Sequence, residues 1–296
     1  MKMKKEMNKM KKLIVLFSLL IALAGCSDAV AKLSAPNTKV LEIGDTVITQ
    51  GEMYQFMTSS DTSTLIINMA KNVIRNAKVE ITDEIREKAE ADLVVMKDIL
   101  KDDFLAGLRQ LGYTSEEDYV ERALIPLAQQ NAMMKKYIED NTDFVIATYF
   151  PRRARIIEFA VEEDAKEVLE AIKAGGNTEE LGKANTTSLD FFGQLATYHR
   201  DSTLPNSIKT VLKDANGPLL TQEVIKDTNG KFYIVEVIEA IPSRFQEEMI
   251  TSLSAVSTLI DTMWLAEFKT AGFAIYDINV YNAIKNGSQS QFLPSR

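Results

Sequence analysis

The chain has 296 residues, of which 46% are hydrophobic, and a formal net charge of −8 at pH 7. This length allows one large domain or two ordinary ones. The acidity argues against nucleic acid as a partner and against charge-driven binding to anionic lipid. A single cysteine and a single histidine argue against disulfides, thiolate or histidine metal sites and a histidine-based catalytic triad. We therefore expect neither a metal nor another cofactor.

The first 25 residues predict a secretion signal. Six lysines and one glutamate give this leader a charge of +5, which leaves −13 for the rest of the chain. The apolar run that follows, 13–23, is shorter than the roughly 20 residues that span a bilayer. It ends in Leu23-Ala24-Gly25-Cys26, which is similar to a bacterial lipobox, although an ordinary signal with a chance cysteine is the alternative. We expect residues 1–25 to be a lipoprotein signal peptide, and lipidated Cys26 to anchor the mature protein at the extracellular face of the cell membrane.

The next part of the chain changes from a tether to helices. Residues 26–39 are small and polar and predict a flexible tether. Residues 40–48 predict two short strands around a Gly-Asp turn, and Thr49 with Glu52 forms the pattern of a helix capping box. Helical periodicity then dominates to residue 140, with further helix starts expected at Thr82 and Ser115.

Between Pro151 and Pro242 the pattern predicts a small α+β domain. Residues 155–161 alternate as a half-buried strand, and 164–174 form an amphipathic helix that ends at Gly175-Gly176. A short helix near 205–213 and, after the turn Asn229-Gly230, a strand over 231–238 follow. This order of elements is typical of an α+β domain.

After Pro242 the helical pattern returns. Apolar residues from Met249 to Ala271 form one long stripe, which Gly272 ends, and 273–280 predict a strand. Such an apolar helix needs a partner, and the N-terminal helices are the simplest one. We therefore predict an α+β fold: a helical domain built from 40–149 and 243–285, a small α+β domain inserted at 150–242, and a disordered tail at 286–296.

These features together resemble the PrsA family of extracellular lipoprotein foldases over nearly the whole chain. The segment 111–119 is similar to a helix entry that the family shares with SurA-type chaperones, and 154–239 is similar to a parvulin domain, which is a peptidyl-prolyl isomerase. The clearest parvulin matches are Ala154-Arg155-Ile156-Ile157, Gly193-Gln194-Leu195, Pro205 and the strand 233–237. The resemblance implies a helical chaperone domain with an inserted parvulin domain, clients that are unfolded or newly secreted polypeptides, and it allows a homodimer.

The parvulin resemblance departs at the positions that carry catalysis. Active parvulins have one His where this chain has Ile156 and another where it has Tyr233. Their catalytic Asp or Cys falls at Ser188, and the Met and Phe of their proline pocket fall at Thr203 and Ser207. The only histidine, His199, is expected to be an exposed loop residue.

These departures predict weak or absent isomerase activity. Rotation about an X-Pro bond has a barrier of roughly 18–20 kcal/mol, and an isomerase needs an apolar proline pocket beside a polar network. A chaperone instead needs an apolar surface open to many clients, for which methionine is well suited. All eight methionines of the mature chain lie in the helical segments, where filling a core is the simpler interpretation.

Three functions remain in competition from the sequence. The first is a membrane-anchored foldase that assists secreted proteins after translocation with a weak or inactive parvulin-like domain. The second is an active peptidyl-prolyl isomerase of the same family. The third, from another class, is a solute-binding lipoprotein of a transporter, which predicts two α/β lobes with parallel strands.

Overall fold

The computed structural model describes residues 32–43, 46–59 and 62–294. The chain divides into two compact units. The first holds the described residues up to Ile74 together with those from Leu265 onwards, and the second holds Arg75–Trp264. The proposed lipid attachment residue, Cys26, lies outside the described residues.

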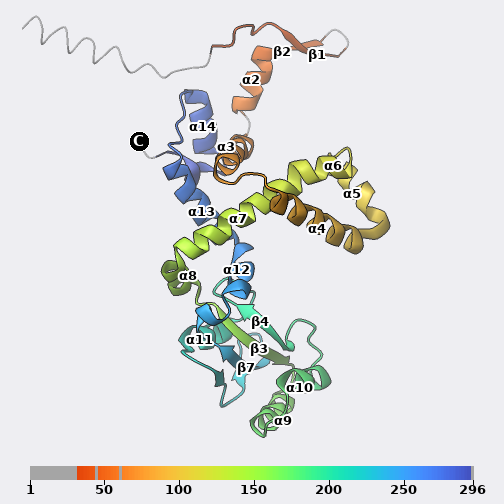
Figure 1. The fold of residues 1–296 in the computed structure, drawn as a ribbon, viewed down its shortest axis with the longest axis vertical. Coiled ribbons are helices and arrows are strands. Elements are labelled where there is room, and N and C mark those ends of the chain that lie inside the picture. Colours follow the sequence, from red (N-terminus) through yellow and green to blue (C-terminus); the bar gives the residue numbers. More distant parts are fainter. Residues whose placement is uncertain (1–31, 44–45, 60–61, 295–296) are drawn as a thin grey trace, which may run out of the picture. The chain divides into compact units, whose positions relative to one another are not determined.

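The first unit begins with a hairpin and a capped helix (Figure 1). Strands β1 (Lys39–Ile43) and β2 (Thr46–Thr49) pair antiparallel, which confirms the two predicted strands. Helix α2 (Gln50–Ser59) follows directly. The Thr49 amide donates to Glu52 Oε2 at 2.8 Å and the Glu52 amide donates to Thr49 Oγ1 at 3.3 Å, so the predicted capping box is confirmed.

Both ends of the chain contribute to this first unit. Its remaining elements are α3 (Ser63–Lys78), which runs past the unit boundary, the end of α13 (Ser257–Thr270), α14 (Ile278–Asn286) and η4 (Ser290–Phe292). The hydroxyl of Tyr54 on α2 donates to Asp277 Oδ2 at 2.7 Å. Asp277 also caps α14 by accepting from the amides of Asn279 and Val280.

Two expectations for the C-terminal segment are wrong. The strand expected over 273–280 is absent from the described structure, because the Asp277 side chain caps α14 and makes the chain helical from Ile278. The disordered tail expected at 286–296 contains η4, and Phe292 within it is only 2% exposed. The tail is ordered there because Phe292 packs against Phe268, with ring centroids 5.1 Å apart.

The helices of the second unit start where side chains cap them. Thr82 accepts a hydrogen bond from the Ile85 amide and Ser115 accepts one from the Asp118 amide, so both predicted helix starts are confirmed. Ala89, Leu124 and Ile125 form a shared core between α4 (Asp83–Leu100) and the start of α7 (Ile125–Asp140). The elements in chain order are α4 (Asp83–Leu100), η1 (Lys101–Asp103), α5 (Phe104–Gln110), α6 (Glu116–Tyr119), the π-helical η2 (Val120–Leu124), α7 (Ile125–Asp140) and α8 (Thr142–Tyr149).

A five-stranded sheet follows in the same unit. Its strand order is β4-β3-β7-β5, with β6 also paired to β7, and every pairing is antiparallel. The strands are β3 (Arg152–Phe159), β4 (Phe192–Tyr198), β5 (Leu219–Leu220), β6 (Ile225–Lys226) and β7 (Phe232–Glu239); the helices between them are α9 (Glu162–Lys173), α10 (Thr178–Asn185) and α11 (Asn206–Asp214). The two parallel-stranded lobes expected of a solute-binding lipoprotein do not occur among the described residues.

The first strand of this sheet is buried on both faces, so the expectation of a half-buried strand is wrong. Ile156 and Ile157 point to opposite faces and both are 0% exposed. Ile156 packs with Ile208 and Leu212 of α11, whereas Ile157 packs with Val168 of α9 in a separate cluster. The predicted amphipathic helix is confirmed as α9, and α11 covers the second face of β3, which a half-buried strand would leave exposed.

The helix after the sheet is divided in two. After η3 (Pro242–Arg244), α12 (Gln246–Ser254) ends before Ala255 and α13 begins at Ser257, so the single stripe expected from Met249 to Ala271 is bent. The bend lets Leu253 and Leu259 both be 0% exposed. Among the described helices none alone is long and apolar enough to cross a membrane; α12 with α13, bent by 85°, passes only by combined length and composition.

The fold is therefore mainly helical with an antiparallel sheet inserted in the middle of the chain, as predicted for the α+β class. The predicted domain boundaries at 149/150 and 242/243 stay predictions.

Candidate functional site

Two of the five positions aligned with parvulin chemistry lie inside the sheet domain rather than on an open groove. Ile156 on β3 is 0% exposed and Tyr233 on β7 is 1% exposed. Both belong to the core cluster between the sheet and α11. In the register of the sheet, Tyr233 pairs with Glu158 and Ile156 pairs with Val235. Packing therefore accounts for both side chains, as the β-propensity of Ile and Tyr favours.

The hydroxyl of Tyr233 reaches the edge of this core and is held by polar neighbours. It donates a hydrogen bond to Glu158 Oε2 at 2.9 Å and accepts one from Asn229 Nδ2 at 3.3 Å. Lys231 forms an ion pair with the other oxygen of Glu158. Burial raises the pKa of Tyr233 above its usual value. The hydroxyl therefore stays protonated at neutral pH and serves Glu158 as a donor.

A second aligned position joins the same polar chain. Ser207, in the first turn of α11, donates from its hydroxyl to Asp227 Oδ1 at 2.9 Å. Asp227 lies in the turn before β7, where its other oxygen accepts from the Asn229 amide at 3.4 Å. A hydrogen-bonded series thus runs along the rim of the sheet from Ser207 through Asp227 and Asn229 to Tyr233.

The other two aligned positions differ in how they relate to this series. Ser188, between α10 and β4, accepts from the Phe191 amide at 3.1 Å, and its own amide donates to Thr186 Oγ1 at 3.1 Å. These bonds hold a turn that is itself tied to Glu158, because Thr186 Oγ1 donates to the Glu158 carbonyl and the Glu158 amide donates to the Phe191 carbonyl at 2.9 Å. Thr203 precedes α11 and is exposed. Hydrogen bonds therefore link Ser188, Ser207 and Tyr233 around Glu158, and Ile156 packs in the same core cluster as Tyr233. No hydrogen bond described for the chain joins Thr203 to them.

One glycine of the parvulin-like motif, Gly193, is required by the local structure. Gly193 opens β4 with φ +89°. A Cβ added there would lie 2.7 Å from the Thr178 carbonyl oxygen of the neighbouring helix. Both facts require glycine, so this match reflects the packing of α10 on β4 and carries no catalytic information.

His199 is buried, and the expectation of an exposed loop residue is wrong. Its side chain is 8% exposed because the turn after β4 is tied down on several sides. The Asp201 amide donates to His199 Nδ1 at 3.2 Å, and the Arg200 amide donates to the Tyr149 carbonyl at 2.9 Å. The hydroxyl of Thr258, on α13, donates to Asp201 Oδ2 at 2.6 Å. This turn therefore joins α8 and the start of α13 to the sheet.

The charges of this turn favour a fixed arrangement. Hydrogen bonding from Arg200 lowers the pKa of Asp201 to about 2. Burial lowers the pKa of His199, although the nearby Asp201 carboxylate acts in the opposite direction. His199 is accordingly neutral at pH 7, with a hydrogen-bond acceptor at Nδ1. Sequence reasoning missed this cluster, because its members come from three distant segments.

An apolar cavity lies in the helical part of the second unit. It has a volume of about 710 Å³ and is formed by α4, α7, α12 and the start of α13. This volume is within the range of roughly 300–1,000 Å³ that ligand pockets occupy. Charged side chains stand at its edge, and Lys135 and Glu247 approach to 3.8 Å. The apolar lining residues are Ile85, Leu127, Ala128, Ala132, Ile250, Ala255 and Ile260.

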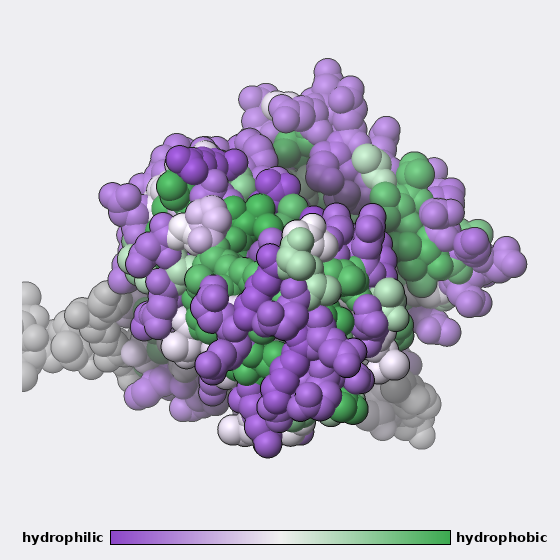
Figure 2. Space-filling view, turned by 90° about the horizontal axis from the view of Figure 1, so that it is seen from below, coloured by the Kyte–Doolittle hydropathy of each residue, from purple (hydrophilic) through white to green (hydrophobic). Residues whose placement is uncertain are grey.

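The helical arm of α4 and α5 presents apolar side chains to solvent. Val95 is 56% exposed and Ile99, one turn later, is 69% exposed. Leu105, on α5, and Leu111, directly after it, are 52% and 72% exposed. Figure 2 shows apolar residues among hydrophilic ones, including on the arm at the right of the view. Single exposed apolar residues are normal on a protein surface, whereas several on one face are typical of an interaction site.

The methionines are divided between core and surface. Met133, Met134, Met249 and Met263 are each no more than 6% exposed, as expected of core residues. Met57 and Met69 are 43% and 61% exposed. Within the residues that the structure describes, no three His, Cys, Asp or Glu side chains are grouped so that they could hold a metal ion.

Comparison with known sequences finds one motif. Residues 10–27 match the model for a prokaryotic membrane lipoprotein lipid attachment site. This match confirms the predicted signal, and with it a protein anchored to the membrane by lipid. A comparison with curated proteins gives no significant match.

Comparison with solved structures finds PrsA proteins. The crystal structure of foldase protein PrsA from Streptococcus pneumoniae shares 19% identity at a TM-score of 0.49, covering 86% of this chain and 100% of that one. The peptidylprolyl isomerase (PrsA) from Bacillus cereus shares 15% at a TM-score of 0.45, covering 85% and 98%. PrsA from Bacillus subtilis shares 17% at 0.38, covering 84% and 99%. Each of these alignments covers more than four fifths of this chain.

Proposed function

We propose that this protein is a lipid-anchored foldase that assists newly secreted polypeptides at the extracellular face of the membrane. Clients bind through apolar helical surfaces, and the sheet domain has little or no isomerase activity. The observation that carries the proposal is the apolar surface of the α4–α5 arm, where Val95 and Ile99 are more than half exposed on one helical face. The attachment signal at 10–27 places the chain at a membrane, where secreted chains emerge unfolded.

The arrangement of the sheet domain supports a role without catalysis. Ile156 and Tyr233 are buried, and the polar groups of Ser207 and Tyr233 are already engaged with Asp227 and Glu158. An isomerase needs an apolar pocket for the proline ring next to free polar groups, and Thr203 and Ser207 supply little apolar surface. The domain then serves as a scaffold or an added client contact.

The test uses the soluble chain that begins at Ser27. Refolding yield of an aggregation-prone client and the rate of X-Pro isomerisation in short peptides are measured on the same preparation. The proposal expects a higher yield without rate enhancement. A double variant, Val95→Ser with Ile99→Ser, should lose most of the effect on yield while its thermal unfolding stays unchanged, because both side chains are exposed. Asp98→Ser, on the same turn of α4, is the matched control.

Two results would contradict the proposal. Unchanged yield in the double variant would show that clients do not use the arm. A clear rate enhancement that is lost in Ser188→Ala or Tyr233→Phe would favour the active isomerase of the same family. Self-association remains a prediction, to be measured by light scattering on the same sample.

A further inference from the structure

A buried phenylalanine, Phe292, attaches the C-terminal segment to the rest of the first unit. Phe292, in η4, is 2% exposed although it lies only a few residues from the C-terminus. Its ring lies 5.1 Å from that of Phe268 on α13, and the Lys71 ammonium stands 4.5 Å from its centre. Phe273 contacts the same Phe268 edge to face at 5.0 Å. Phe292 is therefore received by an aromatic and cationic surface made by other elements of the first unit.

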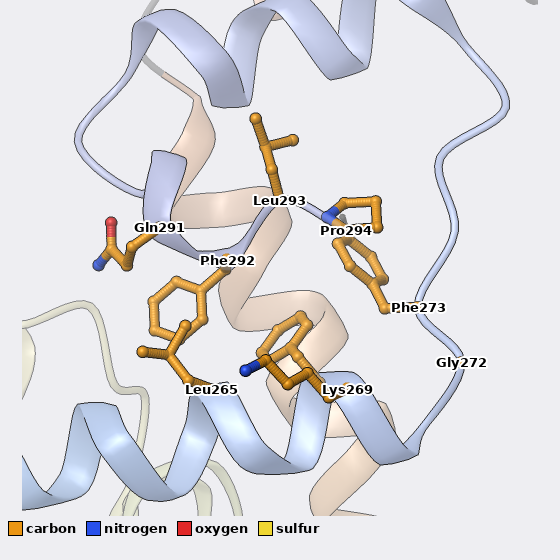
Figure 3. Close-up of a pocket in the computed structure, with 9 residues that line it drawn as sticks. Leu265, Lys269, Gly272, Phe273, Gln291, Phe292, Leu293 and Pro294 are labelled. Carbon is orange, nitrogen blue, oxygen red and sulfur yellow. The ribbon is translucent and has the colours of Figure 1, made fainter. Parts of the chain in front are cut away.

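A cavity of about 290 Å³ adjoins Phe292. Leu265, Phe268, Lys269, Gly272 and Phe273 form one side of it, and the tail residues 291–294 form the other. Figure 3 shows the Phe292 ring pointing toward α13, above Leu265, while Leu293 points away. The space left beside Phe292 is close to the lower end of the volumes that ligand pockets occupy, roughly 300 Å³. With the tail removed, the same wall would be open to a larger apolar group.

The rest of the tail is held weakly. Its backbone bonds are local: the Phe292 amide donates to Gln289 at 3.1 Å and the Leu293 amide donates to Ser290 at 3.2 Å. The described side-chain bond from this segment to another element is the exposed contact between Ser288 Oγ and Thr64 Oγ1 at 3.3 Å. The preceding residues, Asn286-Gly287-Ser288-Gln289, are polar and flexible in composition. Attachment of the tail thus depends largely on Phe292.

We propose that the surface of α13 around Leu265, Phe268 and Phe273 is a binding site for an aromatic segment of an unfolded polypeptide, and that Phe292 occupies it as a tethered competitor. The inference rests on the proposed function, because it names one place where a client would bind. The tail itself shows what chemistry fits: Phe292-Leu293-Pro294 is an apolar segment of the kind that unfolded chains expose. Lys71 adds a cation that favours an aromatic ring over an aliphatic side chain.

The tether makes this competition strong. A segment joined by a short flexible linker acts at an effective concentration on the millimolar scale. A free client must displace the tail. The client's apparent affinity therefore equals its affinity for the open site multiplied by the fraction of molecules in which the site is open. Burying one phenylalanine shifts such an equilibrium by roughly 10- to 100-fold. Removing the Phe292 side chain should raise client affinity by a factor in that range.

The experiment measures binding of a fluorescent peptide with the sequence of residues 287–296 to the full mature chain from Ser27, by anisotropy. Phe292→Ala should bind this peptide at least roughly tenfold more tightly than the unmutated chain does. The same peptide carrying Ser in place of Phe292 should not bind. Ser290→Ala, an exposed neighbour on the same tail that does not line the cavity, is the matched control and should behave like the unmutated chain.

Three outcomes overturn the inference: no gain in affinity for Phe292→Ala, equal binding of the Ser peptide, or an equal gain for Ser290→Ala. If thermal unfolding shows that Phe292→Ala is not folded, Phe292→Leu takes its place, with a smaller gain expected and no gain refuting the idea. Suppression of client aggregation by the unmutated chain, recorded in parallel, tests the proposed function separately. A foldase whose peptide affinity is unaffected by Phe292 would retain the function and lose this site.

Discussion

Replacing Tyr233 with phenylalanine removes one hydroxyl and leaves the ring in place. In the structure this hydroxyl donates to the Glu158 carboxylate at 2.9 Å and accepts from Asn229 at 3.3 Å. Hydrogen bonds to charged groups contribute about 1.5–3 kcal/mol. Glu158 keeps its ion pair with Lys231 and is not left unpaired, so the loss should be near the lower end. We expect the free energy of unfolding to fall by about 1.5–2 kcal/mol.

The assay is urea unfolding of the soluble chain followed by far-UV circular dichroism, with X-Pro isomerisation measured beside it. The control is Tyr198→Phe, the same chemical change in the same sheet. The hydroxyl of Tyr198 makes no hydrogen bond to any residue that the structure describes, and the expected change is within about 0.5 kcal/mol. Isomerisation should be the same for all three proteins. Equal stability losses in both variants, or a rate that falls only in Tyr233→Phe, would refute a purely structural role for the Tyr233 hydroxyl.

Three further predictions concern packing, protonation and anchoring. Gly182→Ala places a Cβ against the backbone carbonyl of Phe192, which cannot move aside, and should cost about 1–3 kcal/mol of stability; Gly107→Ala, a helical site with open surroundings, should instead gain about 0.5–1 kcal/mol, both by urea unfolding. Burial lowers the pKa of His199 in the folded state, so as the pH falls the unfolded chain is protonated before the folded one. The contribution of neutral, buried His199 to the free energy of unfolding is therefore complete above pH 6.5 and is lost as the pH falls below that value. The stability difference between the unmutated chain and His199→Gln should therefore narrow from pH 7.5 to pH 5, and a constant difference would contradict it. Cys26→Ser should abolish incorporation of labelled fatty acid, and persistent labelling would place the lipid elsewhere.

Local features of this fold could be predicted from the sequence. The capping box of Thr49 and Glu52 and the N-caps at Thr82 and Ser115 depend on residues three apart, and all were found. The apolar stripe of α9 was found for the same reason. The second buried face of β3 was missed because its cover, α11, lies about 50 residues further along the chain, and alternation within a strand does not reveal what packs on it.

The candidate site was predictable only in part. A resemblance located Ile156, Ser188, Thr203, Ser207 and Tyr233, but the sequence did not reveal what they contact. The acidic residue of β3 was a signal: Glu158, the one carboxylate in a strand of arginines and apolar residues, is the acceptor for the Tyr233 hydroxyl. No comparable signal marks His199, whose burial depends on contacts of its turn with α8 and α13, far away in the chain.

The pairing of β3 with β7 has a consequence for how this protein can change over evolutionary time. The chain enters the sheet domain on β3 and leaves it on β7, and these strands are antiparallel neighbours in which Arg153 pairs with Glu239. Paired residues in such a ladder lie about 5 Å apart, a gap that a hairpin turn of two residues can close. The sheet domain is thus connected to the rest of the chain through two adjacent strands. The polar groups along the rim of the sheet can be lost or gained, or the whole sheet domain can be exchanged for another, while the helices on either side keep the same connection.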